Sequence, residues 1–163
     1  MIYFIIVFSF LFEAAFSNII TLNSVFTPLF LITSLVILYP YFNNKNFNFI
    51  VVCLLCGLFY DIIFSNSAFV NTISFTVCGA FIILGYNYVN YNILSSNFFN
   101  IIIIIFYRVV SYLLLCILDY TSFNEIHLLE GIYNSLLVNV DYGIIIFILV
   151  ENLAKIFQIK KIE

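Results

Sequence analysis

Long apolar runs separated by short polar breaks occupy nearly the whole chain. Six such runs follow one another, and they are too long and too continuous to be strands. Pro28 suits the first turn of the second run, while Pro40 and the polar residues 43–46 close it. The pattern predicts six helices, over residues 2–20, 28–42, 47–64, 68–86, 98–118 and 131–157.

The apolar runs are near the lower limit for membrane spans, because one crossing takes about 20 residues. Five crossings with one half-inserted segment are therefore an alternative to six. Backbone polar groups in lipid must be satisfied within each helix, so we expect an α-helical bundle. The run IIIIIF at 101–106 lacks the alternation of a membrane β-barrel strand.

The composition agrees with a membrane protein. Of 163 residues, 65% are hydrophobic and 8% are charged, and the mean hydropathy is +1.20. A soluble domain carries about a quarter charged residues. The composition excludes a soluble enzyme, a secreted disulfide scaffold, a disordered chain and a nucleic-acid binder. We expect one transmembrane domain over residues 1–163.

The basic residues predict the orientation of the chain. With six crossings, Lys45 and the tail lysines Lys155, Lys160 and Lys161 lie on one side of the membrane. Loops rich in Lys and Arg face the cytoplasm. We therefore expect both termini in the cytoplasm.

Ionisable residues inside the apolar runs are candidates for function, because burying a charge in lipid costs at least about 2.5–3.5 kcal/mol. Glu13, Arg108 and Asp141 fall near the middle of their predicted helices, and Asp61 lies near the outer end of the third. We expect Arg108 to pair with Glu13, Asp141 or both, since one guanidinium can satisfy two carboxylates. A proton or ion relay is the alternative.

The sequence contains no constellation typical of a catalyst. The single histidine, His127, falls in a predicted outer loop, and motifs of serine hydrolases, zinc proteases and P-loop enzymes are missing. Cys53 and Cys56 form a C-x-x-C inside an apolar helix, where packing is favoured over redox or zinc chemistry. We expect a non-enzyme without cofactor or metal.

The segment CGLFYDIIFSNSAFVNTISFTVCGAFIILG, residues 56–85, carries a resemblance to a known family. Its Gly57-x-x-x-Asp61 ends one helix shortly before the next begins, which resembles the signature of the MreD family of rod-shape-determining membrane proteins. Glu13 in a phenylalanine-rich first helix, Thr27-Pro28-Leu29 before the second and Asn139 early in the last agree with that family, as does the final pair Lys160-Lys161.

The resemblance implies a non-catalytic adaptor of the cell-elongation complex, located in the plasma membrane of a bacterial cell. Members of this family bind the single-span protein MreC, and through it the MreB filament and the glycosyltransferase and transpeptidase of lateral peptidoglycan synthesis. The implied fold has six short transmembrane helices and is similar to the substrate-binding component of energy-coupling-factor vitamin transporters. A small-molecule-binding component of such an importer is therefore the alternative function.

Small residues allow close helix contact in membranes, where lipid gives no hydrophobic drive for association. Candidates for contact with a partner or between helices are Gly57, Asp61, Ser74, Gly79 and Gly85. Candidates for polar pairing within the membrane are Glu13, Arg108, Asp141 and Asn139.

Overall fold

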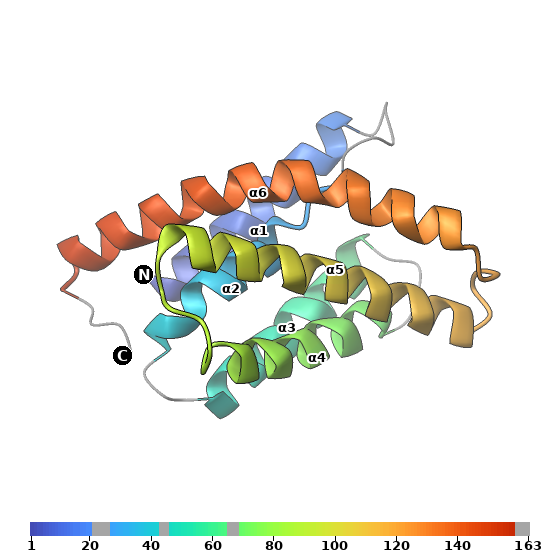
Figure 1. Ribbon diagram of the computed structural model, residues 1–163, viewed down its shortest axis with the longest axis horizontal. Coiled ribbons are helices and arrows are strands. Elements are labelled where there is room, and N and C mark those ends of the chain that lie inside the picture. The colour runs from blue at the N-terminus through green and yellow to red at the C-terminus, as the bar shows by residue number, and fades with distance from the viewer. Residues whose placement is uncertain (21–26, 43–45, 65–68, 159–163) are drawn as a thin grey trace.

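The computed structural model describes residues 1–20, 27–42, 46–64 and 69–158, and this part of the chain is helical without strands. The elements are α1 (Ile2–Ile20), α2 (Phe30–Leu38), the 3-10 turn η1 (Tyr39–Tyr41), α3 (Asn46–Phe64), α4 (Val70–Gly85), α5 (Ile93–Ile117) and α6 (Glu125–Ile156). Successive helices run in opposite directions, so the start of α1 and the end of α6 lie at the same end of the molecule (Figure 1).

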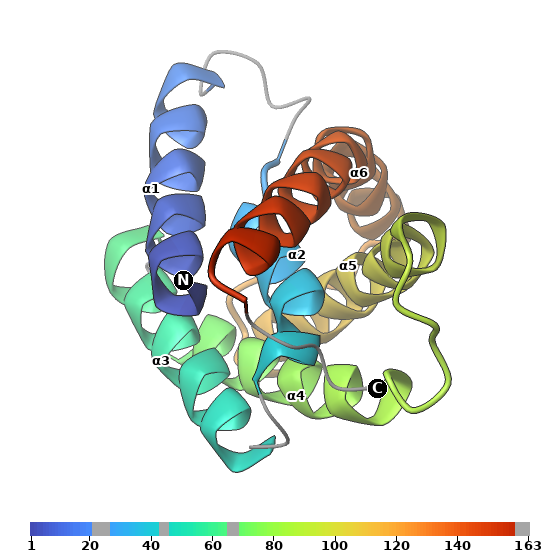
Figure 2. The same ribbon diagram turned by 90° about the vertical axis from the view of Figure 1, so that its left-hand side faces the viewer.

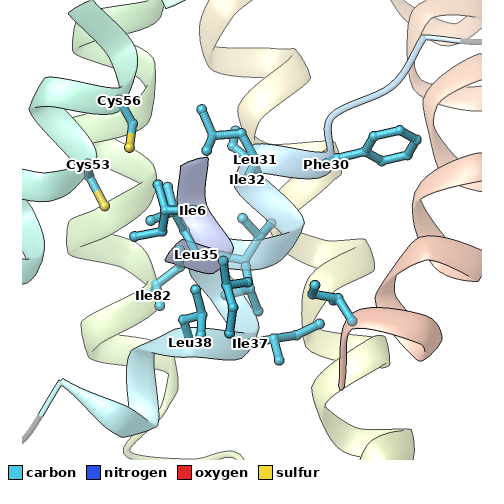
Figure 3. Close-up of a cluster of buried hydrophobic side chains, with 14 of the residues drawn as sticks. Ile6, Phe30, Leu31, Ile32, Leu35, Ile37, Leu38, Cys53, Cys56 and Ile82 are labelled. Carbon is cyan, nitrogen blue, oxygen red and sulfur yellow. The ribbon is translucent and has the colours of Figure 1, made fainter. Parts of the chain in front are cut away.

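The short helix α2 forms the centre of the bundle. Its nine residues are all buried, and the other helices surround it when the molecule is viewed from one end (Figure 2). Leu31, Leu35 and Leu38 of α2 pack towards Ile6 of α1 and Ile82 of α4 (Figure 3). A helix of this length is only about 14 Å long, less than half the thickness of a bilayer core.

Over the described residues, three helices, α3, α5 and α6, are long and apolar enough to cross a membrane. The other apolar stretches found there are shorter, at Ile2–Ser17, Phe30–Tyr41 and Val70–Gly85. The expected all-helical class with six helices is confirmed, while a count of six crossings stays a prediction.

The bundle buries a set of polar side chains within its mainly apolar core and exposes many large apolar side chains. Ser9, Ser34 and Tyr142 join α1, α2 and α6 through hydroxyl contacts of 2.5 Å between the serines and 2.7 Å from Tyr142 to Ser9. Phe4 is 71% exposed and Ile62 is 76% exposed. Large exposed apolar faces are typical of a surface that meets lipid.

Two helices begin earlier than the sequence predicts. The Asn92 side chain accepts a 2.8 Å hydrogen bond from the Ser95 amide, which starts α5 at Ile93 instead of residue 98. The Asn124 side chain accepts a 3.0 Å bond from the Ile126 amide, which starts α6 at Glu125 instead of residue 131. Both breaks contain an N-cap asparagine, a residue that begins a helix inside a polar stretch.

The second predicted helix is shorter than expected. Within the predicted span of 28–42, the α-helix covers only Phe30–Leu38 and the chain then narrows to the 3-10 turn. Pro40 lies in that turn. Its ring and missing N–H are incompatible with a continuing α-helix.

Candidate functional site

The start of α2 is capped by a carboxylate from another helix. Glu13 of α1 is 1% exposed, and its Oε2 accepts a 2.9 Å hydrogen bond from the Leu31 amide in the first turn of α2. The N-cap residue Leu29 has no side chain that could accept a bond. The first amides of a helix have no partner within it and carry partial positive charge. Glu13 therefore satisfies both the hydrogen-bonding need and the charge of this buried helix start.

Asn139 of α6 holds the same helix start from the other side. Its Oδ1 accepts a 2.8 Å bond from the Leu29 amide. Its Nδ2 donates to the Thr27 carbonyl at 3.3 Å and to the Ser135 carbonyl at 2.5 Å. Residues 27–29 are not helical. The side-chain amide of Asn139 therefore supplies the hydrogen bonds that a helix would have formed there within its backbone. The centre of the bundle is thus tied to its first and last helices.

Asp61 of α3 caps α4 in a similar way. Its Oδ1 accepts bonds from the Asn71 amide (3.0 Å) and the Asn71 Nδ2 (2.9 Å), and its Oδ2 accepts from the Thr72 amide (2.8 Å) and the Thr72 Oγ1 (2.6 Å). The N-cap residue Phe69 offers no side-chain acceptor and has a left-handed backbone, with φ of 64°. Asp61 therefore supplies the N-cap that the local sequence of α4 lacks.

Gly57 makes the Asp61 cap possible. A Cβ atom at this position would lie 2.6 Å from the Thr72 Cα and 2.8 Å from the Asn71 carbonyl oxygen. The first turn of α4 therefore rests directly on the backbone of α3. In the Gly57-x-x-x-Asp61 motif, the glycine admits the start of α4 and the aspartate, one turn later, holds it.

The ion pairs that the sequence led us to expect are not formed in the described part of the chain. Arg108 does not pair with Glu13 or Asp141; its Nη2 donates a 2.5 Å hydrogen bond to the Thr27 Oγ1. Asp141 lies on the exposed side of α6. The carboxylates of Glu13 and Asp61 instead accept hydrogen bonds from backbone amides at the starts of α2 and α4. These amides carry partial positive charge and act as the partner in place of the guanidinium.

The remaining small residues, which were predicted to contact a partner or another helix, lie at contacts within this chain. A Cβ at Gly79 would lie 2.8 Å from the Cys53 Sγ, and one at Gly85 would overlap the Phe99 ring. Ser74 is fully buried and its hydroxyl donates to the Val70 carbonyl at 2.8 Å. Together with Gly57 and Asp61, the two glycines lie where α4 packs against α3 and α5.

A cavity of about 410 Å³ adjoins both capped helix starts. Its walls come mainly from α3, α4 and α5, including Tyr60, Tyr107 and Arg108, and are completed by Leu29 before α2 and Tyr120 after α5. Among the described residues that line it, Arg108 alone is charged, and the Arg108 Nε is buried with no partner found in the described ranges. The cavity is suited to an anionic group on an apolar or aromatic body.

The comparisons identify no family. The chain matches no protein-family model, and neither curated proteins nor solved structures give a significant match. Functional interpretation therefore rests on the geometry and on the sequence resemblance. Among the described residues, no group of three His, Cys, Asp or Glu side chains could hold a metal ion.

Several residues of these networks were not singled out from the sequence. The Tyr60 hydroxyl donates to the Glu13 Oε1 at 2.9 Å, and the Tyr107 hydroxyl donates to the Asn71 Oδ1 at 2.6 Å. Asn71 and Thr72 are polar residues at the start of an apolar run, which is a usable signal of a helix start. Tyr107 carries no such signal, because tyrosine is common throughout this chain.

Proposed function

We propose that this protein is a non-catalytic membrane adaptor of the bacterial cell-elongation complex, similar to the MreD family. In this proposal it crosses the plasma membrane six times with both termini in the cytoplasm. It binds the single-span protein MreC and connects the MreB filament to lateral peptidoglycan synthesis.

The observation that carries the proposal is the contact of Gly57 and Asp61 with the start of α4, in which Gly57 allows the close approach and Asp61 caps the helix. These are the residues on which the sequence resemblance rests, and they work as one structural unit, with four hydrogen bonds to Asp61. Buried polar groups used as helix caps favour a rigid scaffold over a centre for turnover. The alternating direction of the six helices supports an even number of crossings (Figure 1).

The orientation part of the proposal depends on the basic residues at one end of the bundle. Lys155 lies in the last turn of α6, at the end that also holds the start of α1 (Figure 1). Lys45, Lys160 and Lys161 lie outside the described residues. A cysteine-accessibility experiment with Lys155→Cys should label this position only from the cytoplasmic side.

Co-purification tests the adaptor function. The tagged protein is expressed with the MreC protein of the same genome and isolated in a mild detergent. We expect the two chains to elute together in a fixed ratio. A version of MreC whose transmembrane segment is replaced by polyleucine is the matched control and should elute separately. Absence of the native MreC from the eluate under these conditions contradicts the proposal.

The cavity beside Arg108 supports a second candidate, a small-molecule-binding component of a vitamin importer. Its volume of about 410 Å³ falls within the range of typical ligand sites. Isothermal titration of the purified protein with a panel of vitamins decides between the two. Saturable binding that is lost in Arg108→Gln favours the importer component, and no binding favours the adaptor.

A further inference from the structure

An exposed carboxylate interrupts the apolar outer face of α6. Asp141 lies on the exposed side of this helix, in line with Leu137, Ile145 and Ile148, which are 54%, 62% and 50% exposed. Steps of four, four and three residues keep side chains on one side of a helix. We name these four residues the Asp141 stripe.

The length of α6 places Asp141 within the hydrocarbon layer. The helix has 32 residues and is about 48 Å long, and Asp141 lies about 24 Å from its first residue. A hydrocarbon core of about 30 Å can shift along this helix by only about 18 Å. Asp141 therefore stays at least about 6 Å inside the core wherever the core is placed, and tilting the helix only lengthens the segment that is covered.

Asp141 has no hydrogen bond or ion pair among the described residues, in contrast to the two capping carboxylates. Its side chain is too short to reach the headgroups, as the longer lysine and arginine side chains can. An ionised group in this position costs at least about 2.5–3.5 kcal/mol. Lipid tails cannot satisfy it, so the stripe has to be covered by a group that can.

The charge of the stripe selects the occupant. A second copy of this chain bound face to face would bring another carboxylate against Asp141, which is unfavourable. A helix with a basic residue at the same depth would neutralise the charge and cover the apolar residues on either side. We propose that the Asp141 stripe is the docking site for a single transmembrane helix of a partner that carries a lysine or arginine facing Asp141. The inference rests on the proposed adaptor function, in which the partner has one membrane span.

Crosslinking in living cells tests the proposal. A photo-crosslinking benzoylphenylalanine replaces Leu137 or Ile145 on the stripe, or Ile62 on the exposed side of α3 as the control position. We expect both stripe positions to form an adduct with one single-span protein whose transmembrane segment contains a basic residue, and Ile62 to form none. The Asp141→Leu variant should lower the adduct yield about tenfold or more, because it removes one member of a buried charge pair.

Two further variants make the result specific. Glu125→Leu removes an exposed carboxylate from the same helix, on the side that faces away from the stripe, and should leave the adduct yield unchanged. Asp141→Lys should abolish the adduct, and exchanging the partner's basic residue for aspartate should restore it. The proposal is overturned if the adducts contain only phospholipid or a second copy of this chain, or if Asp141→Leu leaves the yield unchanged.

The outcomes separate this inference from the proposed function. An Asp141-dependent adduct with a single-span protein other than MreC supports the docking stripe and contradicts the adaptor assignment. Equal co-purification of MreC with the wild type and with Asp141→Leu supports the adaptor assignment and contradicts the docking stripe.

Discussion

In both hairpins, α1–α2 and α3–α4, the second helix begins without a capping side chain of its own, and a residue of the first helix supplies the cap. In each, an acidic residue of the first helix caps the start of the second. Asp61 is 9% exposed and accepts four bonds, all from two consecutive residues. Glu13 is 1% exposed and accepts single bonds from Leu31 of α2 and Tyr60 of α3.

The difference lies in what each cap connects. The Asp61 cap is local, since it joins two helices that follow one another and pack closely along their length. The Glu13 cap connects three helices, and Asn139 adds the last one from 110 residues away in the sequence. We infer that the α3–α4 hairpin can form by itself, whereas the start of α2 needs the assembled bundle.

Removing the Glu13 cap, the more deeply buried of the two, should have the largest effect on stability. Glu13→Ala leaves the Leu31 amide and the Tyr60 hydroxyl without an acceptor in the centre of the bundle. An orphaned buried donor costs about 1–3 kcal/mol, so we expect the free energy of unfolding to fall by about 4 kcal/mol. Unfolding in mixed micelles, followed by the near-ultraviolet circular dichroism of the tyrosines, measures it. Glu130→Ala, an exposed carboxylate, is the control and should change stability by less than about 0.5 kcal/mol.

Removing the Asp61 cap should lower the stability by less. Asp61→Ala removes the acceptor for the amides of Asn71 and Thr72, at a site where the Thr72 side chain is only half-buried. We expect a loss of about 2 kcal/mol, at the upper end of the range for N-cap substitutions. Asp141→Ala serves as the matched control because that carboxylate caps no helix. A loss at Asp61 equal to or larger than that at Glu13 would contradict the comparison of the two hairpins.

The close contact of Gly57 with α4 can be tested by comparing its substitution with that of Gly131, a glycine with no close neighbour. Gly57→Ala places a methyl group against the α4 backbone, and overpacking of this kind costs about 1–3 kcal/mol. At Gly131 in α6 nothing lies within 4 Å of an added Cβ. Gly131→Ala should therefore stabilise the protein by about 0.5–1 kcal/mol through helix propensity. Effects of the same sign at both positions would argue against the close approach of α3 and α4.

The smallest expected effect is a gain in stability at the start of α4. Phe69 has a left-handed backbone, with φ of 64°, which is strained for a bulky residue. Phe69→Gly removes this strain and should raise the free energy of unfolding by about 1 kcal/mol, in the same mixed-micelle experiment. Phe59→Gly, at an exposed and regular helical position of α3, should instead lower it by a similar amount.

The sequence predicts the helices because their apolar runs are continuous, and it marks Glu13, Asp61 and Asn139 because polar groups are rare inside such runs. It led us to an ion pair between Arg108 and Glu13 because opposite charges are visible in a sequence. The charge of a helix start depends on where the backbone turns, and this is decided by tertiary packing. Pro28 indicates that α2 starts nearby, but not that Thr27 and Leu29 bind Asn139 from a distant helix.

The starts of α5 and α6 show the same limit at the level of secondary structure. Asn92 and Asn124 are among many asparagines in this chain, and only their backbone geometry distinguishes them as caps. The sequence marks Gly79 and Gly85 for close contact with a partner or between helices, and the structure places both at contacts between helices of this chain. A small residue in a membrane helix permits close approach but does not identify which helix approaches.

The central claim is that a buried carboxylate of one helix caps the start of another helix in this bundle. The most direct test of it is a distance measurement in lipid bilayers. Solid-state nuclear magnetic resonance can detect the dipolar coupling between the Leu31 amide nitrogen, labelled with nitrogen-15, and the Glu13 carboxylate carbon, labelled with carbon-13. Glu13→Ala provides the background from other labelled pairs. We predict a strong coupling, in keeping with the 2.9 Å hydrogen bond between Leu31 and Glu13. A signal that does not differ from the Glu13→Ala background would contradict the account.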